Sequence, residues 1–155
     1  MTRAHAPAFT VAFTKRSIDK SGKATLVAAS QPGTRAVGMV YRIASADSEA
    51  LDDAEGRSYE RRECFPVICL STGETIQACT YIARREQADL KPYDWYLALI
   101  LAGLREHGLY EEYGAPFLDV LFDTDSDTYR ETRREALKAF EKAKIGDYRA
   151  LLRKS

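Results

Sequence analysis

The sequence predicts an α+β fold, with strands in the first two-thirds of the chain and helices in the last third. Residues 9–13 alternate apolar and small or polar side chains, which is the period of a half-buried strand. Residues 93–104 repeat apolar side chains every three or four positions, which is the period of an amphipathic helix. The length of 155 residues fits one domain of ordinary size.

Strands are expected at residues 9–13, 24–29, 36–43, 63–70 and 75–83. The run at 36–43 is almost continuously apolar, so we expect it to be central in its sheet. Pro66 lacks a backbone N–H, which places its strand at an edge or beside a bulge. The turn residues at 71–74 predict that the last two strands form a hairpin.

Helices are expected at residues 45–54, 92–107, 110–122 and 129–144. Thr128 and Glu131 have the spacing of a capping box for the last helix. The aspartates at 123, 125 and 127 lack the glycine and glutamate of a calcium loop, so we expect them to cap the same helix. Residues 1–122 are the expected main domain, with 123–155 as a helical C-terminal extension packed on it.

Composition argues against several classes of protein. Basic and acidic residues number 23 each, so the chain lacks the basic excess of a nucleic-acid-binding protein. It has no apolar run of the roughly 18 residues that a membrane span needs. Neither a signal peptide nor a metal-ligand spacing is present, so we expect a cytoplasmic protein without a metal site. The three cysteines are expected to be buried, reduced thiols, with a disulfide between two of them as the alternative.

One run of residues carries a candidate site. Leu51-Asp52-Asp53-Ala54-Glu55-Gly56 places a carboxylate at the end of a short helix, and Tyr59 follows closely. From the residues alone, Glu55 is either an acid held near a pocket or a solvated glutamate in the last turn of a surface helix. The run by itself does not decide between these interpretations.

Three segments, in this order, resemble the gamma-glutamylcyclotransferase family. They are Phe13-Thr14-Lys15-Arg16-Ser17 with Ser21-Gly22-Lys23-Ala24; Val37-Gly38-Met39-Val40-Tyr41 leading to Leu51–Gly56 and Tyr59; and Tyr93-Asp94-Trp95-Tyr96-Leu97-Ala98 leading to His107-Gly108-Leu109 and Glu112-Tyr113. The resemblance covers about residues 9–120.

The resemblance implies a small mixed β-barrel with surrounding helices. It also implies a cofactor-free enzyme that converts a γ-glutamyl amine or amino acid to 5-oxoproline and a free amine. The family's catalytic glutamate lies in a Leu-Asp-x-x-Glu-Gly motif, so the general acid/base would be Glu55. Tyr59, Tyr81 and Tyr93 would bind substrate. Gly38 joins this set, because a glycine within a strand indicates either a bulge or a close backbone approach.

The chain departs from the family pattern at its start. The family's first strand leads into a Tyr-Gly-Ser-Asn loop that holds the substrate, and this sequence contains no such segment. Either this segment lies upstream of the first residue, or the protein has lost the substrate-holding loop. In this chain we therefore expect a barrel without its first strand, and a homodimer formed by strand exchange that covers the exposed edge. The alternative function is a non-catalytic binding or structural relative that has lost the substrate-holding loop.

Overall fold

A computed structural model describes residues 1–154. Their contacts group them into two compact units. One unit comprises residues 1–16 and 23–89, and the other comprises residues 17–22 together with the chain from residue 90 onwards. The first contains the paired strands and helix α1, and the second contains the remaining helices. These units are defined by contacts alone, so the expected domain division at residue 122 stays a prediction.

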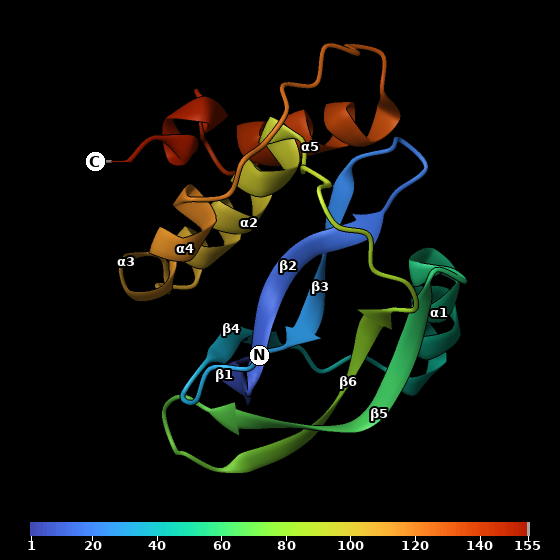
Figure 1. Ribbon diagram of the computed structural model, residues 1–155, viewed down its shortest axis with the longest axis vertical. Coiled ribbons are helices and arrows are strands. Elements are labelled where there is room, and N and C mark those ends of the chain that lie inside the picture. The colour runs from blue at the N-terminus through green and yellow to red at the C-terminus, as the bar shows by residue number, and fades with distance from the viewer. Residues whose placement is uncertain (155) are drawn as a thin grey trace. The chain divides into compact units, whose positions relative to one another are not determined.

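The strands of the first unit form a four-stranded sheet in the order β4-β1-β5-β6 and a separate β2-β3 pair (Figure 1). In the four-stranded sheet, β1 pairs antiparallel with β4 and with β5, and β5 pairs antiparallel with β6. The elements are β1 (Thr2–Pro7), β2 (Phe9–Arg16), β3 (Gly22–Ala28), β4 (Arg35–Val40), the 3-10 turn η1 (Ser45–Asp47), α1 (Ser48–Glu55), β5 (Tyr59–Cys69) and β6 (Thr75–Ala83).

Strand β1 was missed by the sequence analysis. It pairs with β4 along its whole length and meets β5 at Ala4 and His5. Its inward residues Ala4 and Ala6 are 3% and 4% exposed. Alanine carries little apolar surface, so an alternation built on alanines gives a weak strand signal.

The position expected for β4 was wrong. It is the terminal strand of the sheet and not a central one. Its apolar residues Val37, Met39 and Val40 are only half-buried, and they line a cavity. A continuous apolar run therefore arises here because the strand borders a hollow, not because strands cover both of its sides.

The hairpin of β5 and β6 was predicted correctly, and it carries a bulge. The register shifts between Arg62 and Phe65, and Cys64 in that interval has a positive φ of 52°. Pro66 follows directly, which fits the prediction of a neighbouring bulge. Below the bulge, Phe65 and Val67 join Ala4, Ala6 and Ala36 in the core of this unit.

Helix α2 (Asp94–Glu106) organises the second unit, as its periodicity predicted. Its Leu97 and Leu101 are almost fully buried, and it packs against α5 (Glu131–Lys142) and the 3-10 turn η2 (Tyr148–Leu152). The helix expected at 110–122 is two single turns, α3 (Tyr110–Tyr113) and α4 (Ala115–Leu118).

The predicted cap of α5 does not form. The helix starts at Glu131 with Arg130 as its N-cap and no side-chain capping bond. The Asp125 carboxylate instead accepts hydrogen bonds from Trp95 Nε1 (2.9 Å) and Arg130 Nε (2.7 Å). A buried carboxylate without hydrogen-bond donors costs more free energy than an uncapped helix end, because water can solvate the helix end. Tertiary contacts therefore override the capping pattern.

The cysteines are free thiols, but only Cys69 is buried, whereas Cys64 and Cys79 are exposed. The expectation of burial was therefore wrong for two of them: Cys64 lies in the bulge of β5, and Cys79 lines a cavity. No helix within residues 1–154 has the length and apolar character needed to cross a membrane.

Candidate functional site

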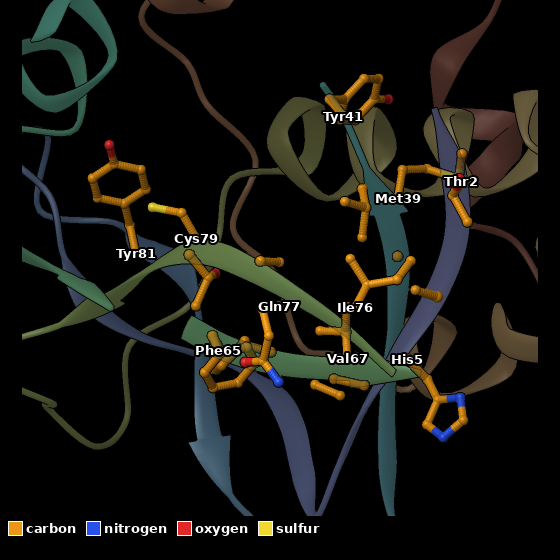
Figure 2. A pocket seen from close by; sticks show the side chains of 18 of the residues that line it. Thr2, His5, Met39, Tyr41, Phe65, Val67, Ile76, Gln77, Cys79 and Tyr81 are labelled. Carbon is orange, nitrogen blue, oxygen red and sulfur yellow. The ribbon is translucent and has the colours of Figure 1, made fainter. Parts of the chain in front are cut away.

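A cavity of about 1010 Å³ lies in the first unit, over the curled four-stranded sheet. Its walls come mainly from β1, β4, β5, β6 and α1, with Val11 of β2 and Leu26 of β3. Figure 2 shows the side chains that line it, with Tyr81 and Cys79 standing side by side on β6 and Tyr41 at the end of β4. One part of the lining is apolar, including Phe65, Val67 and Ile76, and another carries polar and charged groups.

The end of α1 brings Glu55 to this cavity. Leu51 and Glu55, one turn apart on the helix, both line it, and Glu55 is half-buried. The helix stops at Gly56, whose N–H donates to the Asp52 carbonyl at 3.0 Å. Gly56 has φ 70° and ψ −178°, a conformation that is essentially reserved for glycine. This glycine therefore fixes where the helix ends and where Glu55 lies.

Of the sequence-predicted site residues, the structure brings Glu55, Tyr81 and Gly38 to the same cavity. Gly38 lies on β4 opposite Ala4, and a Cβ built there would meet no atom within 4 Å. Open space beside this backbone is consistent with the close approach predicted for it.

Tyr59 is placed differently. Its hydroxyl donates a hydrogen bond to the Ala24 carbonyl at 3.0 Å, and Lys15 Nζ lies 5.0 Å from the centre of its ring. Tyr59 is not among the residues of the described chain that line the cavity. Its hydroxyl links β5 to β3, so its role in substrate binding stays a prediction.

Tyr93 belongs to the second unit. Its hydroxyl donates to the Asp19 carbonyl at 3.3 Å and accepts from Arg130 Nη2 at 3.5 Å. The Arg130 guanidinium lies 5.0 Å from the ring centre. Burial is the main cause that raises the pKa of Tyr93, so the phenol keeps its proton at neutral pH. Whether Tyr93 binds substrate stays a prediction.

A network of three side chains beside Glu55 was missed from the sequence. Arg61 and Tyr81 are direct cross-strand partners on β5 and β6, so they leave the sheet on the same face. Both reach Asp52 on α1: the Tyr81 hydroxyl donates to its Oδ1, and Arg61 Nη1 lies 3.0 and 3.1 Å from its two oxygens. Tyr81 and Arg61 lie 29 and 9 residues from Asp52 along the chain, so no local sequence pattern predicts this network.

The network fixes the charges of its members. The hydrogen bond from Tyr81, and then that from Arg61, lower the pKa of Asp52, so this carboxyl is ionised at neutral pH. The bond to Asp52 raises the pKa of Tyr81 to about 12, so the phenol remains a donor. Arg61 Nε also lies 3.1 Å from Glu63.

The described residues offer no evident metal site. Within residues 1–154, no group of three or more histidine, cysteine, aspartate or glutamate side chains is placed to hold a metal ion. His5 lines the cavity, but Figure 2 shows its ring turned away from Tyr81 and Cys79. Burial, and then the charge of Arg35, lower the pKa of His5, which keeps its imidazole neutral.

Comparison with known proteins gives a family and a fold. The model of the AIG2-like family matches residues 35–116, a range that includes all five predicted site residues. A solved structure described as gamma-glutamyl cyclotransferase superposes with a TM-score of 0.77 and 21% identity, covering 90% of this chain and 84% of that one. A human protein described as uncharacterized protein loc79017 gives 0.76 and 22%, covering 89% and 83%.

A third structure, YkqA from Bacillus subtilis, superposes with a TM-score of 0.64 and 19% identity, covering 79% of this chain and 45% of that one. A comparison with curated protein sequences gives no match. At these identities the structural matches show the fold alone, and they confirm the predicted α+β architecture of curled sheet and helices.

Proposed function

Because the chain belongs to the AIG2-like family, we propose that it is a gamma-glutamylcyclotransferase-like enzyme that releases 5-oxoproline from a γ-glutamyl amine or amino acid. The observation that carries this proposal is the position of Glu55. This carboxylate ends α1, is half-buried and lines the cavity together with Tyr81 and Gly38. A single acid at the wall of a cavity that is large enough for a small molecule suits this chemistry.

The proposed reaction needs one group that moves protons. Glu55 takes a proton from the substrate's α-ammonium group, and the freed amine attacks the γ-carbonyl carbon. A carbon–nitrogen bond forms and closes the five-membered ring, and the original amide carbon–nitrogen bond breaks. Glu55 then gives this proton to the leaving nitrogen and carries a second proton to it from the new ring nitrogen. The ring nitrogen ends as a neutral lactam N–H and the free amine leaves as an ammonium group, so atoms and charge balance.

Positioning supplies much of the rate in such an intramolecular step, because the two reacting ends must be folded together. The substrate is a small molecule, and the proposed mechanism needs no cofactor. In this proposal the Tyr81 hydroxyl and the backbone at Gly38 contact the γ-glutamyl group, and substrate binding by Tyr59 and Tyr93 remains part of the proposal. A cytoplasmic location remains part of the proposal.

The direct test is to incubate the protein with a panel of γ-glutamyl dipeptides and to measure 5-oxoproline by mass spectrometry. We expect Glu55→Gln to reduce turnover by at least about 10²-fold, because the amide cannot move the proton. Glu49→Gln is the matched control, since Glu49 is exposed on the first turn of the same helix. Equal turnover in both variants would contradict the role assigned to Glu55.

The alternative is a non-catalytic binding relative, and the same panel distinguishes it. A binding protein would show saturable chemical-shift changes at Tyr81 and Gly38 with γ-glutamyl dipeptides and form no 5-oxoproline. An enzyme would form 5-oxoproline and lose that activity in Glu55→Gln.

We also propose a homodimer formed by strand pairing. Strand β4 ends the four-stranded sheet, and Tyr41 and Ile43 just after it are 58% and 48% exposed. A terminal strand with apolar residues beside it is a template for pairing with another chain. Light scattering should give twice the mass of one chain, and Ile43→Lys should lower it. A single-chain mass at every concentration would contradict the dimer.

A further inference from the structure

Helix α1 has little of its own to hold it in place. It is eight residues long and contains no buried residue, and its N-cap Asp47 makes no side-chain capping bond. Helices shorter than about 12–15 residues are marginal in water, so contacts with other elements must fix this one. Because Glu55 is the last residue of α1, whatever fixes the helix also fixes Glu55.

Backbone bonds close the end of the helix, and side-chain contacts join the helix to the sheet. Backbone bonds at its end run from Gly56 N–H to Asp52 and from Tyr59 N–H to Gly56, at 3.0 and 3.3 Å. The side-chain contacts are those of Asp52 with Tyr81 on β6 and with Arg61 on β5. The backbone bonds set where the helix stops, whereas only the side-chain contacts reach across to two separate strands.

Helical geometry couples Asp52 to Glu55. Residues three apart on an α-helix are rotated by about 60° and displaced by about 4.5 Å along the axis, so they share a face. Asp52 on this face contacts the β5–β6 hairpin, and Glu55 one turn later lines the cavity. A rotation of α1 that moved Asp52 off its partners would also turn Glu55 relative to the cavity.

We propose that Asp52 is a positioning residue for Glu55: its carboxylate, held by the Tyr81 hydroxyl and the Arg61 guanidinium, sets the rotation of α1 and directs Glu55 into the cavity. This inference rests on the proposed function for its catalytic consequence. Asp52 is not one of the described residues that line the cavity, so it acts through Glu55 and not on the substrate.

The charges agree with a permanent attachment and not with a switch. The hydrogen bonds from Tyr81 and then from Arg61 lower the pKa of Asp52, and the bond to Asp52 raises the pKa of Tyr81, so acceptor and donor keep their forms through neutral pH. The pair of Arg61 and Asp52 is 31% and 45% exposed in its side chains, and exposed pairs contribute little to global stability. We therefore expect this ion pair to affect the position of Glu55 and not the global stability. A displacement of a catalytic group by about 1 Å can lower the rate by about 10²-fold.

The kinetic test compares Asp52→Ala and Asp52→Asn with Asp53→Ala. Asp53 is an exposed aspartate on the same helix and is the matched control. We expect Asp52→Ala to lower kcat by about 10- to 100-fold with KM and Tm close to those of Asp53→Ala. Asp52→Asn should recover part of kcat, because its amide oxygen still accepts the Tyr81 hydrogen bond. No recovery in Asp52→Asn, or a kcat of Asp52→Ala equal to the control, would overturn the proposal.

A second measurement does not depend on turnover. Hydrogen exchange of the amides in residues 48–56 should be at least about 10-fold faster in Asp52→Ala and in Tyr81→Phe than in Asp53→Ala. If the wild-type protein forms no 5-oxoproline, the proposed function fails, and this comparison still decides whether Asp52 holds the helix. Equal exchange in Asp52→Ala and Asp53→Ala would overturn the positioning role even in an active enzyme.

Discussion

Replacing Arg130 by alanine should strongly destabilise the second unit, because it removes the partner of a buried charge. The Asp125 side chain is 1% exposed, and Arg130 Nε lies 2.7 Å from it. Breaking a buried ion pair by removing one partner costs about 3–5 kcal/mol. Arg130 is 21% exposed, and Asp125 keeps the donors Trp95 Nε1 and the N–H of Asp127, so we expect the low end, about 3 kcal/mol.

The destabilisation caused by Arg130→Ala should depend on pH in a definite direction. Burial alone would raise the pKa of Asp125, but hydrogen bonds from Arg130 and then Trp95 outweigh it and lower the pKa below 3.8. In the wild type the stabilisation is therefore present above about pH 4 and is lost as pH falls through the folded pKa. Without Arg130, burial dominates and raises the pKa of Asp125. Acidification then protonates this carboxyl and removes the destabilisation caused by its unpaired buried charge. The difference in unfolding free energy should be largest near neutral pH and shrink as pH falls through the raised pKa of Asp125 in the variant.

Urea unfolding followed by tryptophan fluorescence measures this locally, since Trp95 is the single tryptophan and contacts Asp125 directly. Arg134→Ala, at an exposed position of α5, is the control and should change the unfolding free energy by less than about 0.5 kcal/mol. A loss below about 1 kcal/mol at pH 7 in Arg130→Ala, or a difference that grows on acidification, would refute the reasoning.

Two further predictions concern the first unit. Gly56→Ala should lower the unfolding free energy by about 1–3 kcal/mol and loosen the end of α1. The conformation with φ 70° and ψ −178° strains any residue with a Cβ, although no atom would clash. Urea unfolding followed by circular dichroism measures this loss, and an unchanged midpoint would contradict the prediction. In the native protein a thiol reagent should label Cys64 and Cys79 quickly and Cys69 only on unfolding. The hydrogen bond with Ser71 is the main cause that lowers the pKa of Cys69 to about 7, but burial blocks access, so fast labelling of all three thiols would show that accessibility was misjudged.

Local patterns in the sequence determined most of the secondary structure. The helical period of residues 93–104 appears as α2, and the turn at 71–74 appears as the β5–β6 hairpin. These elements were predictable because their signals lie within one element: an apolar stripe or a pair of turn residues. The position of Glu55 at the end of a helix stopped by Gly56 was predictable for the same reason.

Only the tertiary structure decided the order of the strands and the partners of the polar groups. β1 escaped detection because its buried residues are alanines, and β4 was wrongly expected to be central because its apolar residues border a cavity and not a second strand. Asp52, Arg61 and Tyr81 meet across α1, β5 and β6, and Asp125 binds Trp95 and Arg130 instead of capping α5. Such contacts join residues that are far apart along the chain, and the need of each buried or ionised group for a partner is satisfied only once the elements pack.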